Sequence, residues 1–192
     1  FPTRRSSDLS INWIIISGLR HISIGNDTYT YKVHAFDPII NKTWGKLFTD
    51  FINILFRSAT GKDPGYAFFE KTVQIFTTNY QLYLIVIALV FTVPLGIWIY
   101  KNSIEPCISF LIYSCLFYSF FSITGIRQTI ATALVVIIGY KFIKGRKFWA
   151  FLLLMLVAST IHKSAICFFP FYFIANKKIT RRYLIEIGRA SC

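Results

Sequence analysis

Apolar runs long enough to enter a lipid bilayer, separated by polar turns, constrain this chain more than any other feature. Residues 82–100 form the clearest run, and as a helix they would reach about 28 Å, close to the thickness of a hydrocarbon core. Residues 107–124 and 128–143 form two more, and residues 11–17 are the tail of another. Only 15% of the residues are charged, so a single soluble core could not bury this much Phe, Ile and Leu. The sequence therefore predicts an all-α, polytopic integral membrane protein.

Both ends of the chain resemble translated sequencing-adapter DNA. Residues 4–9 and 186–191 match a common adapter read on opposite strands, and the neighbouring residues extend these segments to 1–9 and 186–192. Segments of this kind are left out of fold prediction. We therefore expect a single polytopic membrane domain over residues 10–185, which is an internal fragment of a longer protein.

The apolar stretches at residues 148–161 and 164–175 are divided by His162 and Lys163. One helix through both stretches would hold Lys163 near the bilayer centre, which costs at least about 2.5 kcal/mol. Two short segments avoid this cost, and a broken segment is tolerated where the break faces protein or an aqueous cavity. We therefore predict two segments with a break at His162.

Basic residues predict which side of the membrane each turn faces. Nine lie on one side: Lys101, Lys141, Lys144, Arg146, Lys147, Lys177, Lys178, Arg181 and Arg182. The opposite short turns hold only Arg127 and Lys163, so the positive-inside rule makes the first side cytoplasmic. Four ionisable residues are then extracytoplasmic: Arg20, Asp27, Arg127 and His162. Ionisable groups beside membrane segments are expensive and indicate a functional site.

The long segment between residues 20 and 81 contains a predicted amphipathic helix. Apolar side chains recur at helical spacing over residues 44–56, and polar side chains occupy the other positions. This pattern is typical of a helix that lies on the membrane surface or covers the spans, here on the extracytoplasmic side. After a turn-rich break, Tyr66, Phe69, Val73 and Phe76 repeat the helical pattern.

The net charge of +13 indicates cytoplasmic loops beside anionic lipid. The basic residues lie in short clusters between apolar runs, which argues against a nucleic-acid-binding face. Cys107, Cys115 and Cys167 lie in apolar runs without metal-type spacing, and the three histidines have no such spacing either. We expect no metal, no cofactor and no nucleic-acid partner.

Three short polar groups are candidates for chemistry. In the first, Arg20 is followed by Asp27 and Tyr29. A guanidinium fork suits a phosphate or pyrophosphate, and a carboxylate can act as a general base or orient a sugar hydroxyl. The alternative is an arginine bound to lipid headgroups and an aspartate in a turn.

The second group is Arg127 with Gln128, at the outer end of the 128–143 run. A helix N-terminus favours anions, and an arginine there deepens the site, although a snorkelling arginine is the alternative. The third group is His162 with Lys163. The histidine could act as a general acid or base and the lysine could contact phosphate, whereas the alternative is a histidine held by structural hydrogen bonds.

Taken together, these groups resemble the EpsG family, the Wzy-like polymerases of bacterial exopolysaccharide and capsule synthesis. The matching pieces, in the family's order, are residues 18–20, 25–29, 65–66, 126–131 and 162–165. The first spans are truncated and the later part of the family's chain is missing. The acidic residue that usually precedes Gly-Tyr is Asp63 here, with Pro64 between, and these residues alone read most simply as a turn.

The resemblance implies a multi-pass glycosyltransferase-type enzyme of the bacterial cytoplasmic membrane. It would join polyprenyl-pyrophosphate-linked oligosaccharide repeat units on the extracytoplasmic face. The donor pyrophosphate is itself a good leaving group, so no covalent nucleophile is required. The expected partners are the lipid-linked oligosaccharide, the bilayer and other membrane proteins of polysaccharide assembly.

The resemblance also implies roles for individual residues. Asp27 or His162 would accept the proton of the acceptor hydroxyl. The pyrophosphate and sugars would be bound by a larger set: Arg20, Arg127, Gln128, Lys163, Tyr29 and Tyr66. Tyr31 and Trp44 are further aromatic side chains that could stack on sugars.

Other membrane proteins would present similar residues. A lipid-linked oligosaccharide flippase or transporter also places arginine in a cavity, but it is expected to show inverted repeats with matching broken helices, and only one broken region is present. A membrane acyltransferase would use His162, but the sequence offers no second catalytic histidine near a membrane helix. A structural membrane subunit with interfacial arginines is the remaining alternative.

Overall fold

The computed structural model describes residues 4–25, 27–57, 61, 63–116, 119, 123–175 and 177, and this part of the chain is helical without strands. The elements before the first long apolar helix are α1 (Arg4–Gly18), α2 (Thr28–Tyr31), the π-helical η1 (Lys32–Phe36), α3 (Asp37–Ile40), α4 (Trp44–Phe56) and α5 (Pro64–Gln74). The remaining elements are α6 (Tyr80–Asn102), α7 (Pro106–Cys115), α9 (Ile126–Thr132), the π-helical η2 (Ala133–Ile138), α10 (Gly139–Lys144), α11 (Phe148–Ile161), the 3₁₀-helical η3 (Lys163–Phe168) and α12 (Phe171–Ile174).

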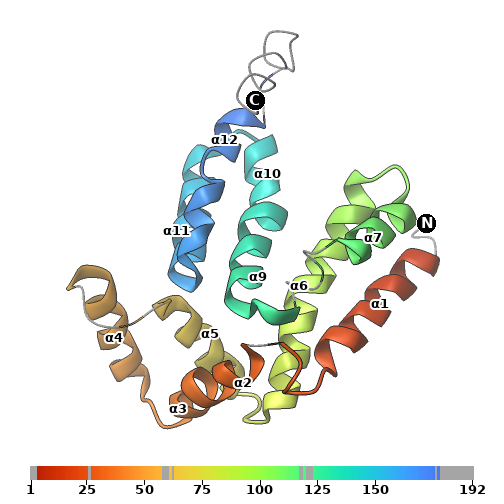
Figure 1. Ribbon diagram of the computed structural model, residues 1–192. Helices are drawn as coiled ribbons and strands as arrows, with labels where there is room; N and C mark the ends of the chain where they lie inside the picture. The colour runs from red at the N-terminus through yellow and green to blue at the C-terminus, as the bar shows by residue number, and fades with distance from the viewer. Residues whose placement is uncertain are drawn as a thin grey trace, which may run out of the picture.

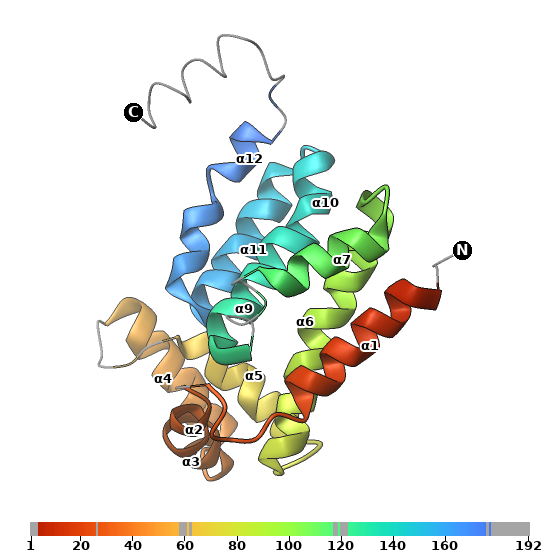
Figure 2. The same cartoon turned by 45° about the vertical axis from the view of Figure 1, so that its right-hand side comes forward.

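The short helices α2 to α5 gather at one end of the longer helices (Figure 1). Both ribbon views show α1 beside α6, and α9 and α10 beside α11 (Figures 1 and 2). The side chain of Gln81 links the start of α6 to the end of α1, because its Nε2 donates to the carbonyl oxygen of Gly18 at 2.6 Å. The α2 to α5 group therefore covers the ends where α1 stops and α6 begins.

Within the described part of the chain, two helices are long and apolar enough to cross a membrane. These are α6 and the continuous helical segment of α9, η2 and α10 over residues 126–144. They contain the runs predicted at residues 82–100 and 128–143, so the prediction of helices there is confirmed. Asn79 accepts hydrogen bonds from the backbone N–H groups of Gln81 and Leu82, which satisfies two of the donors left free at the start of α6.

The single span predicted at residues 107–124 is wrong as one continuous helix. α7 ends at Cys115, and Leu116 is extended, with φ −80° and ψ 147°. The hydroxyl of Ser119 donates to the carbonyl oxygens of Ser114 and Leu116, and so takes up acceptors left free by the end of the helix. Residues 117–118 and 120–122 of this run lie outside the described residues.

The break predicted at His162 is confirmed. α11 ends at Ile161, and His162 is extended, with φ −156° and ψ 122°. The stretch beyond it is not the single apolar helix that residues 164–175 suggest, because it begins as the 3₁₀ helix η3 and continues as the short α12. His162 therefore lies at the break between the two segments, and its side chain is partly exposed.

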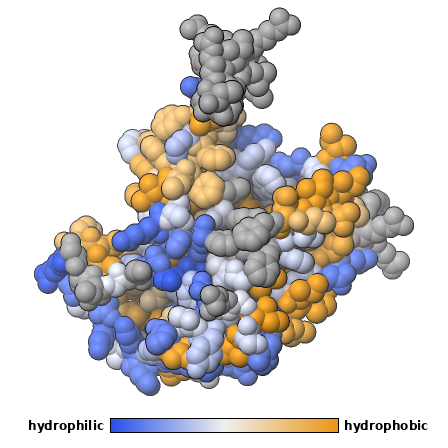
Figure 3. Space-filling view, in the orientation of Figure 1, coloured by the Kyte–Doolittle hydropathy of each residue, from blue (hydrophilic) through white to orange (hydrophobic). Residues whose placement is uncertain are grey.

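The amphipathic helix predicted at residues 44–56 is confirmed as α4. Thr43 caps it, since its side chain accepts from the backbone N–H of Lys46. Hydrophilic side chains dominate the surface over α2 to α4, whereas hydrophobic ones cover much of α1, α7 and α12 (Figure 3). On this face, the helices that cover one end of the molecule are therefore also the most polar.

The largest buried side chains tie this polar cap to the long helices. Phe36 of η1 packs against Tyr83 of α6 with ring centroids 4.6 Å apart, and both are fully buried. Tyr80 donates from its hydroxyl to the carbonyl oxygen of Thr28 at 2.8 Å. The opposite end of α6 and α10 carries Lys101 and Lys144, while Lys178, Arg181 and Arg182 of the predicted cytoplasmic set lie outside the described residues.

Candidate functional site

Asp63, just before α5, stands at the centre of a charged cluster. Its backbone is left-handed, with φ 53° and ψ 57°, and its side chain is only 7% exposed. This conformation is uncommon for residues other than glycine, and strained backbone gathers at functional sites. The residue that follows is Pro64, which pre-forms the first turn of α5. The sequence places the carboxylate at a turn, and the fold buries it.

Arg127 of α9 pairs with this carboxylate across the fold. Its Nη1 donates to Oδ2 of Asp63 at 2.8 Å, and its Nε donates to the Tyr31 hydroxyl at 3.2 Å. The guanidinium carbon also lies 4.8 Å from the centroid of the Tyr31 ring and 5.9 Å from that of Tyr66. Two tyrosines and one carboxylate therefore hold the guanidinium, which remains about one-quarter exposed.

His162 reaches the same carboxylate from the end of α11. Its Nδ1 lies 3.5 Å from Oδ2 of Asp63. The approach of α5 to α11 is close because position 65 is a glycine, where an added Cβ would lie 2.1 Å from Oγ1 of Thr160. A carboxylate at Nδ1 orients the imidazole ring and leaves Nε2 as the nitrogen for chemistry.

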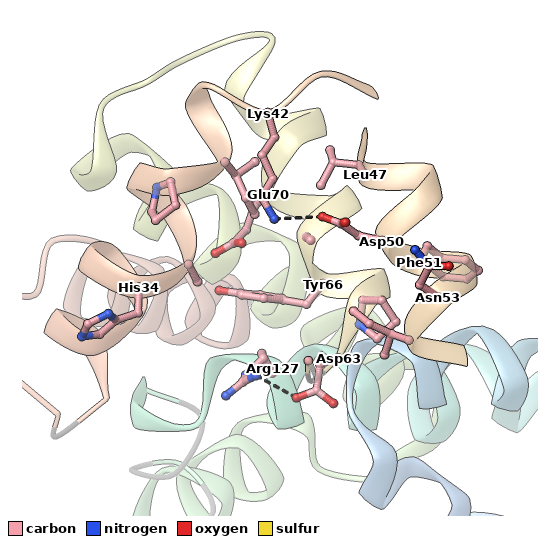
Figure 4. A pocket seen from close by; sticks show the side chains of 17 residues that line it. His34, Lys42, Leu47, Asp50, Phe51, Asn53, Asp63, Tyr66, Glu70 and Arg127 are labelled. Carbon is pink, nitrogen blue, oxygen red and sulfur yellow. Dashed lines mark hydrogen bonds and ion pairs between the residues drawn. The ribbon is translucent and has the colours of Figure 1, made fainter. Parts of the chain in front are cut away.

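A cavity of about 430 Å³ opens beside the cluster (Figure 4). Asp63 and Arg127 line one side, and α4 provides Asp50 and Asn53 on another. Asp50 accepts from Nζ of Lys42 at 3.0 Å. The volume lies within the usual range of small-molecule sites, and its polar lining offers both donors and acceptors. The cavity can therefore hold a polar ligand in contact with the charged cluster.

A second carboxyl group, that of Glu70, lines this cavity from deep within α5. Its side chain is fully buried, and within the described residues neither carboxyl oxygen has a hydrogen-bond partner. Burial raises the pKa of Glu70 from 4.5 to about 8, against the opposing effects of the Tyr66 hydroxyl and the Arg127 charge. Tyr66 lies between Glu70 and Arg127 (Figure 4), and its hydroxyl accepts from that of Tyr83 at 2.7 Å. Burial therefore favours the protonated form of Glu70 at neutral pH.

Some residues predicted from the sequence lie apart from this cluster. Asp27, Tyr29 and Lys163 are exposed, and none of them lines the cavity. Gln128 is partly buried beside Arg127 and does not line the cavity either. The structure thus brings together Arg127, His162 and Tyr66 out of the predicted set.

Arg20 is a buried cation with few partners. It is 4% exposed, and Nη1 donates to the carbonyl oxygen of Ser17 at 2.5 Å. Within the described residues its Nε and Nη2 have no hydrogen-bond partner. Burial lowers the pKa of Arg20, although the nearby phenol groups of Tyr80 and Tyr66 act in the opposite direction. The guanidinium therefore keeps unused donors beside the same tyrosine that contacts Arg127.

Three parts of the site are not predicted as site residues from the sequence. Asp63 is interpreted as a turn residue and as the acidic residue that the resemblance places before Gly-Tyr, Tyr31 only as an aromatic that could stack on sugars, and Glu70 is not singled out. A carboxylate just before the Pro64-Gly65-Tyr66 motif was the one available signal for Asp63. Among the described residues, no group of three His, Cys, Asp or Glu side chains could hold a metal ion.

Comparisons with known proteins agree with the resemblance described above. A family model described as the EpsG family matches residues 10–187, a range that contains Asp63, Arg127 and His162. No curated protein and no solved structure gives a significant match. Because the family match covers most of the sequence, the chain belongs to the EpsG family, a family of membrane proteins in polysaccharide biosynthesis.

Proposed function

We propose that this protein is a polysaccharide polymerase that joins polyprenyl-pyrophosphate-linked oligosaccharide repeat units on the extracytoplasmic face of the bacterial cytoplasmic membrane. The observation that carries the proposal is the convergence of Arg127 and His162 on Asp63 beside a polar cavity. Residues 10–185 form one multi-pass membrane domain in this proposal, with α2 to α5 covering its outer end. Family membership supports the pathway and the membrane setting.

The reaction transfers the growing glycan from one lipid carrier to another. The acceptor hydroxyl oxygen forms a bond to the anomeric carbon of the donor sugar, and the bond from that carbon to the pyrophosphate oxygen breaks. The lipid pyrophosphate leaves with the bonding electron pair. Arg127 binds its developing negative charge, since a partly exposed guanidinium beside a cavity can offer donors to phosphate oxygens.

His162 accepts the proton that the acceptor hydroxyl loses. The 3.5 Å contact of Nδ1 with Asp63 directs Nε2 away from the carboxylate, where it can act as the general base. Asp63 then stabilises the imidazolium and holds Arg127 at the same time. Of the two bases considered from the sequence, His162 is favoured over Asp27, because His162 is partly buried and contacts Asp63, whereas Asp27 is exposed.

The remaining residues act in substrate binding. Tyr66 and Tyr31 hold the guanidinium of Arg127, and Tyr66 also lines the cavity, where a sugar could bind. Arg20, which is buried and does not line the cavity, would reach a second phosphate oxygen only after a side-chain movement that exposes its unused donors. Gln128, Lys163 and Tyr29 are proposed to contact parts of the substrate that extend beyond the cavity.

Complementation of a polymerase-deletion strain tests this function. Arg127→Ala is expected to leave single repeat units on the cell surface, whereas Arg57→Ala, an exposed arginine at the end of α4, should restore the ladder of longer glycans. A flippase would instead lose all surface glycan when inactivated. Full polymer length with Arg127→Ala would refute the donor-binding role.

A further inference from the structure

Beside the polar cavity, a shallow groove of about 490 Å³ is formed by α4, α5 and the last two turns of α11. Its apolar lining includes Phe48, Phe51, Phe68, Leu156, Val157 and Ile161. Thr160 supplies the one hydroxyl in the lining, and this hydroxyl donates to the carbonyl oxygen of Val157 at 2.7 Å. The groove lining therefore holds no charged side chain and no free hydroxyl to recognise a polar ligand.

The groove adjoins the polar cavity beside the charged cluster. Phe51 lines both the polar cavity and the groove, so a single side chain separates them. Ile161, at one end of the groove, directly precedes His162, and Gly65 lies two residues after Asp63. A ligand that filled both spaces would need a polar part at the cluster and a hydrocarbon part beginning one side chain away.

An exposed apolar stripe extends the groove along α11. Trp149, Leu153, Leu156 and Val157 are between 49% and 78% exposed, and their spacing puts them on one face of the helix. This stripe runs from the groove toward the end of α11 that is remote from His162. It offers a path for a chain longer than the groove itself.

We infer that this groove binds the polyprenyl tail of the donor substrate. The inference rests on the proposed function and adds the place where the lipid lies. In a lipid-linked sugar the pyrophosphate is bonded directly to the hydrocarbon chain, so the two chemistries adjoin as the cluster and the groove do. With the pyrophosphate at Arg127, the first prenyl units lie between Phe51 and Ile161, and later units follow the stripe on α11.

Photolabelling tests the inference without requiring sugar transfer. The probe is a polyprenyl pyrophosphate without sugar that carries a benzophenone on its tail, added to the purified protein in detergent. Peptides that contain Phe48 or residues 156–161 are expected to be labelled, and unlabelled polyprenyl pyrophosphate should compete. Val157→Trp fills the groove and should lower this labelling about tenfold.

Two further variants keep the test decisive. Ile97→Trp places the same bulk on a similarly exposed residue of α6, and should label as the wild type does. Val157→Ser introduces a polar group without bulk, and should lower labelling even if the tryptophan variant fails to fold. Labelling that is unchanged by both Val157 variants would overturn the inference.

A phospholipid probe with a benzophenone on its acyl chain forms the second arm. Labelling of the groove by this probe, undiminished by polyprenyl pyrophosphate, would identify a general lipid contact and would also overturn the inference. Failure of the polymerase proposal gives a different pattern: groove labelling persists while the wild-type protein builds no polymer. Polymer formation without groove labelling would overturn only the tail site.

Discussion

Nδ1 of His162 lies 3.5 Å from Oδ2 of Asp63, although 99 positions of the chain separate the two residues. The break after α11 frees the imidazole, and the left-handed backbone before α5 turns the carboxylate toward it. The same oxygen accepts from Arg127, so one buried carboxylate serves a base and a cation together. Changes at Asp63 should therefore affect both ends of the proposed reaction.

Asp63→Asn should lower polymerisation about 100-fold, which is the low end of the range for general acid–base catalysis. Asparagine tolerates the left-handed conformation, so the backbone should be kept while the charge is lost. Glycan ladders and turnover of purified lipid-linked units measure the effect. The matched control is Asp37→Asn, which removes a half-exposed carboxylate paired with Lys32 outside the cavity. Normal turnover with Asp63→Asn would exclude an electrostatic role for the carboxylate.

Arg127→Ala should also destabilise the folded protein, by about 3 kcal/mol, because it leaves the 7% exposed Asp63 carboxylate without its cation. Arg127→Lys keeps a charge and should recover most of this stability. It should recover little activity, since an ammonium group lacks the planar fork of donors. Thermal unfolding in detergent, beside the polymerisation assay, separates the two effects. Equal stability of the alanine variant and the wild type would mean that the ion pair does not support the fold.

The buried carboxyl of Glu70 predicts a pH dependence of stability. Its pKa is raised to about 8 in the folded protein, so between about pH 4.5 and 8 the folded state holds a proton that the unfolded state has lost. The contribution of Glu70 to the free energy of unfolding should be at its maximum below about pH 4.5. It should fall as the pH rises to about 8, by at most about 1.4 kcal/mol for each unit of the pKa shift.

Glu70→Gln should remove this dependence, because glutamine does not ionise. The variant should unfold at a higher temperature than the wild type at pH 8, and at a similar temperature near pH 5. Glu105→Gln, at an exposed position, controls for loss of a carboxylate. Parallel unfolding curves for Glu70→Gln and the wild type across this pH window would contradict a protonated Glu70.

Gly65→Ala should separate α5 from α11. The added Cβ would lie 2.1 Å from Oγ1 of Thr160 and 3.0 Å from the backbone carbon of the same residue. Thr160→Ala in the same chain removes the first contact and leaves the second, so it should restore stability only in part. Thermal unfolding and polymerisation should both report the loss. Gly45→Ala, where an added Cβ meets nothing within 4 Å, should leave the protein unchanged.

Local patterns in the sequence were enough to predict several elements. The apolar run at residues 82–100 lies within α6, and the helical spacing at residues 44–56 corresponds to α4. The break at His162 followed from the cost of holding Lys163 in the bilayer. The single helix predicted over residues 107–124 was wrong, because hydrophobicity indicates burial in lipid or protein and does not require an unbroken helix.

The sequence by itself determined the helical class, the family and the candidacy of Arg127 and His162, because each depends on the spacing of residues within one segment. Only the tertiary structure made Asp63 their common partner and buried Glu70 beside them. Asp63 lies 64 positions from Arg127 and 99 from His162, and no local pattern encodes such contacts. They arise because α11 packs against both α5 and α9, and the absence of a side chain at Gly65 allows the close approach of α5 to α11.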